Sequence, residues 1–190
     1  MDVLTHAYFV NLDSDDWDLQ YEAYQKILEI TKREVTWAYE VWDELVEHLR
    51  HKDPHIRSRA AQFLAHLAIS DPEERILDDF PKLWRVATKD PKFVTKRHSL
   101  QSIWRVGLAG KKQKDLLLDH LIDWFKNCEN EKNCTLIRSD IIQGLRNLHS
   151  EAPSSRLEHI AYDLIELETD EKYKAKYEKT WKVHKQKLSK

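Results

Sequence analysis

Arginine, glutamine and tryptophan side chains recur along the sequence at spacings that favour recognition of an anion or of a flat chemical group. Four glutamines, at positions 25, 62, 101 and 143, are separated by 37, 39 and 42 residues. Guanidinium groups bind carboxylates or phosphates through two parallel hydrogen bonds, and an indole ring offers a stacking surface beside them. The predicted partner-binding residues are Arg59, Gln62, His66, Arg97, Gln101, Trp104, Arg105, Gln143 and Arg146.

Patterns that mark an enzyme or a metal site are absent from the sequence. No His-Glu-x-x-His motif occurs, and His48, His51 and His55 are divided by a predicted helix break. The three glycines are Gly107, Gly110 and Gly144, so no glycine-rich phosphate loop is present. The two cysteines, Cys128 and Cys134, have no second pair with which to bind zinc and form no disulfide framework. We therefore expect no catalytic residue, no metal and no cofactor.

The composition indicates that helices position these side chains. Hydrophobic residues make up 41% of the 190 residues, enough for a continuous core, whereas three glycines and five prolines are too few for the turns of an all-β fold. Asp-Pro pairs at 53–54, 71–72 and 90–91 are typical helix starts, because aspartate accepts from free backbone N–H groups and proline fits the first turn. Apolar stripes predict helices near 3–11, 14–32, 35–51, 54–69, 72–88, 92–108, 112–128, 133–149, 154–168 and 170–188.

An internal repeat connects these helices. The segments AYQKILEI (23–30), AAQFLAHL (60–67), SLQSIWRV (99–106) and IIQGLRNL (141–148) align at offsets of 37, 39 and 42 residues. A period near 40 residues is typical of repeated helical hairpins. We therefore predict one domain over residues 1–190, with repeats at about 3–32, 35–69, 72–108 and 112–149 and a C-terminal capping helix pair at 154–188.

The junction between the helices resembles that of the HEAT repeat family. Residues 49–64 (LRHKDPHIRSRAAQFL) contain a leucine, an Asp-Pro turn, an aliphatic-Arg pair and small residues before a final leucine. The resemblance implies an all-α α-solenoid, or superhelix, of about four to five antiparallel helical hairpins. It also implies that Arg57 and Arg138 bond between repeats and that Pro81 kinks a first helix. The second helices of such repeats line a concave face, so their polar positions are expected to point outward.

Charge is polarised along the chain, although the net charge is only −2. Residues 1–50 carry 12 acidic and 4 basic residues, whereas residues 172–190 carry eight lysines and one acid, Glu178. No membrane-spanning run and no export signal are apparent, so we expect a cytoplasmic protein without membrane association.

Aromatic residues divide into core and surface candidates. We expect most of Trp17, Trp37, Trp42, Trp84 and Trp124 to fill gaps between helices, and Trp104 to be partly exposed. Tyr173, Tyr177 and Trp181 follow one another at intervals of four on a lysine-rich helix. That stripe is interpreted as a terminal cap over the core, or alternatively as a docking face for a partner or an anionic polymer.

Two functions remain open on these observations. The favoured one is a non-enzymatic scaffold that binds a protein partner through its concave face. The alternative is nucleic-acid binding, since some bacterial alkylpurine DNA glycosylases have HEAT-like repeats with a basic groove containing Trp, Arg and Asp. This sequence has residues of the same types at Arg97, Trp104, Arg105, Arg138 and Asp140. It lacks that family's segment of paired Trp and Asp residues. The sequence does not name the partner or the oligomeric state.

Overall fold

The computed structural model describes residues 1–182, which form ten α-helices, two short 3-10 segments and no strand. The helices are α1 (Val3–Asn11), α2 (Trp17–Ile30), α3 (Ala38–His48), α4 (Pro54–Leu67), α5 (Arg75–Lys89), α6 (Phe93–Ile103), α7 (Lys111–Asn127), α8 (Cys134–Glu151), α9 (Ser155–Glu166) and α10 (Glu171–Lys182). The 3-10 segments are η1 (Ala68–Ser70) and η2 (Trp104–Leu108). The predicted all-α class is confirmed, and residues 183–188 of the last predicted helix lie outside the described part.

Aspartates at helix starts explain where several helices begin. Asp53 caps α4 by accepting a hydrogen bond from the backbone N–H of His55 at 2.7 Å, with Pro54 in the first turn, as predicted. Asp16 caps α2 in the same way through the N–H groups of Asp18 and Leu19. Local sequence therefore decides these boundaries without help from tertiary contacts.

The other two Asp-Pro pairs do not start their helices, which corrects the prediction. Asp71 lies four residues before α5, and Glu74 between them adopts a left-handed φ of 55° that interrupts the helical path. The carboxylate of Asp71 still accepts from the N–H of Ile76 at 2.7 Å. Asp90 lies three residues before α6 and bonds to Arg57 on α4 as well as to the backbone N–H of Lys92. Neither aspartate is therefore the residue directly before its helix, and Asp90 also bonds to a neighbouring helix.

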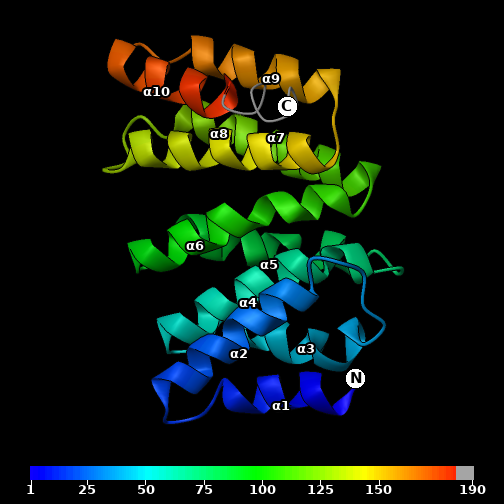
Figure 1. Ribbon diagram of the computed structural model, residues 1–190. Coiled ribbons are helices and arrows are strands. Elements are labelled where there is room, and N and C mark those ends of the chain that lie inside the picture. Colours follow the sequence, from blue (N-terminus) through cyan, green and yellow to red (C-terminus); the bar gives the residue numbers. More distant parts are fainter. Residues whose placement is uncertain (183–190) are drawn as a thin grey trace, which may run out of the picture.

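The helices stack in chain order from α1 at one end to α9 and α10 at the other (Figure 1). Each helix packs against the next one along the chain in the pairs α1 with α2, α3 with α4, α5 with α6, α7 with α8 and α9 with α10. The even-numbered helices also contact one another in series, α2 with α4, α4 with α6, α6 with α8 and α8 with α10. We call the surface formed by these five helices the even-helix face.

A continuous apolar core runs through the stack. It includes Ile27, Trp42, Phe63, Phe80 and Phe125, which are all almost fully buried. Removing this much apolar surface from water is the main favourable contribution to folding. The core continues to α10, where Tyr177 and Trp181 are buried, so the aromatic stripe of that helix covers the end of the core.

Arginine-carboxylate bonds link successive helix pairs. Arg57 on α4 donates from Nε to Asp90 Oδ2 at 2.6 Å and from Nη2 to Asp90 Oδ1 at 3.0 Å. Arg138 on α8 donates to the carbonyl oxygen of Phe125 at 3.0 Å and to Glu168 Oε2 at 3.1 Å. Each arginine therefore bonds to a carboxylate in the loop after the next odd-numbered helix, which is α5 for Arg57 and α9 for Arg138.

The loop between α7 and α8 is closed by a disulfide between Cys128 and Cys134, whose Cα atoms are 5.3 Å apart. No disulfide framework was expected from two cysteines, so this pairing is a finding of the structure. The turn between α7 and α8 brings together the two cysteines, which are six positions apart in the sequence. Their Cα atoms then lie within the range that a disulfide requires.

Candidate functional site

Three of the nine predicted partner-binding residues are buried, and two of them, Gln62 and His66, lie on α4. The side-chain oxygen of Gln62 accepts from the hydroxyl of Tyr24 at 2.7 Å, and its amide nitrogen donates to Ser58 O at 3.1 Å. His66 Nδ1 lies 3.0 Å from Thr31 Oγ1. Burial, helped by the positive charges of Arg105 and Lys32, lowers the pKa of His66 to about 3, so its ring is neutral at pH 7. Both residues join α2 to α4, and the prediction that they point outward is wrong.

Arg97 and Gln101 on α6 bind the same carboxylate on α8. Arg97 donates to Asp140 from Nε at 2.7 Å and from Nη2 at 2.9 Å, and Gln101 donates from Nε2 at 3.0 Å. Asp140 is buried, whereas Gln101 is exposed and the Arg97 side chain is 36% exposed. The guanidinium group that the sequence assigned to a partner is therefore already paired within the chain.

Trp104 and Arg105 lie in η2, directly after α6. Arg105 is buried and donates from Nη2 to the carbonyl oxygens of Thr31 and Lys32 at 3.1 and 3.2 Å, beyond the C-terminal end of α2. A cation at a helix C-terminus satisfies free carbonyls and complements the helix dipole. Trp104 is half-buried, as expected, and packs beside Gly144, with the guanidinium of Arg105 5.4 Å from its ring centroid.

The remaining three predicted residues lie apart from this network. Gln143 is exposed on α8 and donates to Asn147 Oδ1 at 2.8 Å. Arg146 is half-buried, and its guanidinium lies 5.5 Å from the ring centroid of Trp181 on α10. Arg59 on α4 donates from Nη1 to the carbonyl oxygen of Leu12 at 2.8 Å. The nine residues therefore do not form one exposed cluster, and most of them hold helices together.

A groove on the even-helix face has a different aromatic wall. Trp17 and Tyr21 on α2 stack with ring centroids 5.2 Å apart and an interplanar angle of 7°. Both rings are accessible, with 69% of Trp17 and 50% of Tyr21 exposed. They border a groove of about 450 Å³ whose other lining residues are Gln20, Tyr24, Asp53, His55, Ser58, Arg59, Gln62 and His98. We call this groove, with its ten lining residues, the aromatic groove.

The opposite wall of the aromatic groove is polar and mostly engaged in internal bonds. Asp53 caps α4, and Gln62 holds the hydroxyl of Tyr24. Burial, with the nearby positive charge of Arg97, lowers the pKa of His98, which keeps its imidazole neutral at pH 7. The groove thus combines open aromatic surface on α2 with polar groups on α4.

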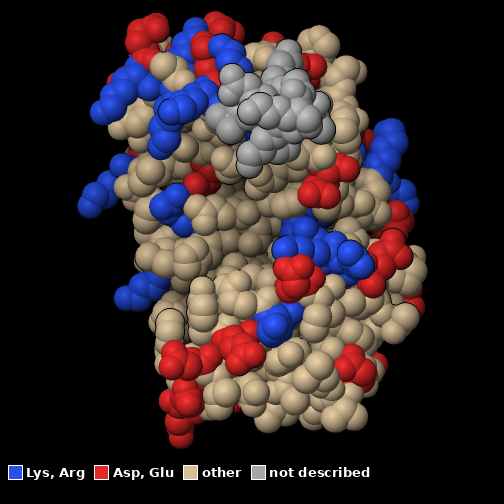
Figure 2. Space-filling view, viewed as in Figure 1, with Lys and Arg blue, Asp and Glu red and all other residues tan. Residues whose placement is uncertain are grey.

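Acidic residues flank the aromatic wall along the chain. Trp17 follows Asp16 and precedes Asp18, and Asp13 and Asp15 lie in the loop before α2. In Figure 2 acidic side chains gather at the lower left, where Figure 1 places the start of α2, whereas basic side chains gather near α10. The polarity of charge predicted from the sequence is therefore visible on this side of the molecule.

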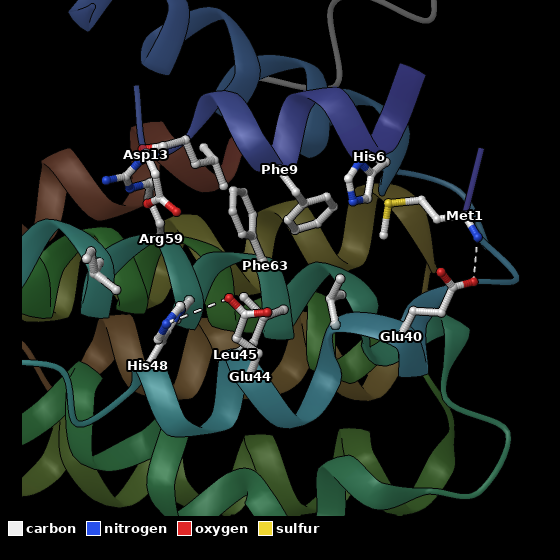
Figure 3. Close-up of a pocket in the computed structure, with 14 residues that line it drawn as sticks. Met1, His6, Phe9, Asp13, Glu40, Glu44, Leu45, His48, Arg59 and Phe63 are labelled. Carbon is white, nitrogen blue, oxygen red and sulfur yellow. Dashed lines mark hydrogen bonds and ion pairs between the residues drawn. The ribbon is translucent and has the colours of Figure 1, made fainter. Parts of the chain in front are cut away.

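A second hollow, of about 240 Å³, lies between α1 and the pair α3 and α4. Figure 3 shows Phe9 and Phe63 projecting into its middle, with ring centroids 6.1 Å apart, and Arg59 at one end. The terminal amino group of Met1 bonds to Glu40 at the other end. It lies beneath α1, and half of its lining residues belong to the core or pack against it, whereas Arg59 also lines the aromatic groove.

Sequence reasoning missed Trp17, which it assigned to the core. Helical periodicity gave no signal for this exposure, because at about 100° per residue Trp17 lies only about 20° around the helix from Tyr24 and Leu28, which pack against the core. Trp17 is the first residue of α2, and its exposure is decided by what covers that end of the helix.

Other chemistry finds little support within residues 1–182. No three His, Cys, Asp or Glu side chains there converge as metal ligands would, and no helix there has the length and apolar character needed to cross a membrane. The residues that resemble those of alkylpurine DNA glycosylases do not form one group. Asp140 binds Arg97, whereas Arg138 binds Glu168.

No family model matches the chain. A search of curated proteins likewise finds no match. The function must therefore be argued from the fold and from the aromatic groove.

Proposed function

We propose that this chain is a HEAT-like helical-repeat scaffold, an α-solenoid of about five antiparallel hairpins, that binds a protein partner through its even-helix face. The serial packing of helix pairs supports this architecture, because each pair contacts its neighbours along the stack. The bonds from Arg57 to Asp90 and from Arg97 to Asp140 also support it, since both connect one pair to the next.

The stacked pair of Trp17 and Tyr21 carries the proposal. Aromatic side chains stabilise a protein when they are buried, and the exposed ring of Trp17 gives up most of that contribution. Large aromatic residues are enriched where interfaces concentrate their binding energy, because they bury much area and lose little conformational entropy. Exposed rings beside a groove are therefore best explained by a partner that covers them.

Nucleic acid is less favoured as the partner. Phosphate recognition needs cationic groups that face solvent, whereas Arg97 is paired with Asp140 and Arg105 donates to backbone carbonyls. The aromatic groove also lies at the acidic end of the chain, where residues 1–50 carry 12 acids against 4 basic residues. A phosphate backbone would be repelled there.

Capture from native lysate tests the proposed function when groove variants are compared directly. The tagged wild type should retain a protein, with and without nuclease, that the Trp17→Ala/Tyr21→Ala double variant loses. Leu19→Ala is the matched control, because Leu19 is also exposed on α2 (42%) but does not line the groove. It should retain the same protein as the wild type.

Two results would contradict the proposal. One is a set of captured proteins that is identical for the wild type and the double variant. The other is capture that disappears after nuclease treatment, which would assign the face to nucleic acid. Circular dichroism of each variant should match the wild type, because both deleted rings are exposed and the buried residues of α2 are unchanged.

A further inference from the structure

We propose that the aromatic groove binds an arginine side chain on a basic segment of a protein partner, with the guanidinium lying flat against Trp17. This inference rests on the proposed function, because it names the chemistry of the partner at the same site. It follows from three features: an open aromatic surface, exposed carboxylates beside it in the sequence, and a facing wall whose one arginine donates to a backbone carbonyl.

The aromatic surface fits a planar cation. Tyr21 covers one face of the Trp17 indole at 5.2 Å, and the 69% exposure of Trp17 leaves its other face to solvent. A cation over an aromatic face is attracted by the negative potential of the ring, and tryptophan is the best of the aromatic residues for this interaction. A guanidinium stacks in parallel with such a ring and loses little hydration, whereas an ammonium is compact and strongly hydrated. Arginine therefore fits better than lysine.

The carboxylates next to this surface are accessible. Asp15, Asp16, Asp18 and Glu22 are all exposed, and Asp13 is exposed in the same loop. None of the ion pairs formed among residues 1–182 involves any of them. One side-chain oxygen of Asp16 accepts the hydrogen bonds that cap α2. Exposed carboxylates near a binding surface attract a cation and steer its approach.

The facing wall does not favour an acidic partner. Arg59 is the one arginine that lines the aromatic groove, and its Nη1 donates to the carbonyl oxygen of Leu12. His98 is neutral at pH 7, because burial lowers its pKa. His55 lies beside the cap residue Asp53, whose carboxylate offsets positive charge on that side. A carboxylate or phosphate entering the groove would meet the acidic loop before α2 without a compensating cluster of cations.

Fluorescence anisotropy with defined peptides tests this inference. The probe is a fluorescein-labelled Gly-Ser peptide of about twelve residues that contains three arginines. Matched peptides replace the arginines by lysine, glutamine or glutamate, and a labelled single-stranded DNA of similar length is the nucleic-acid probe. We expect the arginine peptide to bind more tightly than the lysine peptide, and the other probes not to bind at the same concentrations.

Variants locate the binding and identify its cause. Trp17→Ala/Tyr21→Ala should weaken binding of the arginine peptide about fivefold or more, while Leu19→Ala leaves it unchanged. Asp15→Asn/Asp18→Asn keeps every ring and the cap residue Asp16, so it should fold normally. It should weaken binding and make it less sensitive to salt, because screened charges contribute less at about 0.3 M than at about 0.05 M ionic strength.

Each remaining outcome decides against the inference. Equal affinity for the arginine and glutamine peptides, unchanged binding by the double ring variant, or a Kd weaker than about 1 mM for the arginine peptide would overturn it. Tighter groove-dependent binding of the glutamate peptide or of the DNA would overturn it as well. If lysate capture still depends on Trp17 and Tyr21, only the choice of arginine fails and the proposed function stands. If capture is also independent of these rings, both fail.

Discussion

Arg97 on α6 and Asp140 on α8 form an ion pair with two hydrogen bonds, one from Nε at 2.7 Å and one from Nη2 at 2.9 Å. The carboxylate is buried, with its side chain only 8% exposed, whereas the arginine is one-third exposed. Two-point contacts of this kind fix geometry as well as adding stability. The relationship defines Arg97 as a connection between helix pairs.

Replacing Arg97 by alanine should destabilise the fold. The change leaves the Asp140 carboxylate buried with only Gln101 as a partner, and we expect the free energy of unfolding to fall by roughly 1–3 kcal/mol. Urea denaturation measures the difference. Gln143→Ala serves as the control, because Gln143 is exposed and bonds only within α8, so its effect should stay within about 0.5 kcal/mol. Equal stability of the two variants would contradict the structural role of Arg97.

The stability of the protein should fall in mild acid because of His66. Its pKa is about 3 in the folded state and about 6.5 when unfolded, so the unfolded chain binds more protons between these values. The stabilising contribution is therefore complete above about pH 6.5 and is lost progressively as the pH falls toward 3, at up to roughly 1.4 kcal/mol per pH unit.

The His66→Gln variant isolates that contribution, because glutamine does not titrate. Denaturation midpoints measured from pH 7 to pH 4 should decrease more steeply for the wild type than for this variant. Parallel curves would show that His66 does not titrate differently on folding.

Two glycines should respond oppositely to alanine. A Cβ on Gly144 in α8 would lie 3.5 Å from Trp104 Cβ, an ordinary contact, and alanine is the better helix former by about 1 kcal/mol. A Cβ on Gly107 would lie 2.8 Å from Leu148 Cδ2 and 3.1 Å from Leu117 Cδ2, both side chains of the core. We expect thermal unfolding to show Gly144→Ala as neutral or more stable and Gly107→Ala as less stable by about 1–3 kcal/mol. A reversed order would be incompatible with this packing.

Duplex DNA should bind weakly, if at all. A protein that contacts several phosphates loses roughly three or more decades of affinity between about 50 and 200 mM salt. The internal bonds of Arg97 and Arg105 withdraw these two guanidinium groups from phosphate contacts, so we expect a labelled duplex to show no submicromolar binding even at about 50 mM salt. Submicromolar binding that collapses at about 200 mM would favour the nucleic-acid alternative over a protein partner.

Helix positions followed from the sequence because their causes are local. Asp53 and Pro54 sit next to the backbone groups they affect, so α4 begins where the pair predicts. The repeat alignment also placed Trp104 correctly as a partly exposed residue. Arg57, which is distant in the sequence, competes for the carboxylate of Asp90. The helix that follows, α6, begins three residues after that aspartate.

The sequence by itself determined that the described chain is all-helical and which stripe of each helix is apolar, because periodicity depends only on the residues of that helix. Only the tertiary structure decided which polar side chains face solvent. Gln62 and Arg105 lie away from their own apolar stripes, yet Tyr24 and the end of α2, 38 and 74 residues distant, cover them. Trp17 is apolar, yet no neighbouring helix covers it, which leaves the aromatic groove open. The burial of a residue depends on which side chains of other helices cover it. The periodicity of one helix carries no information about those side chains.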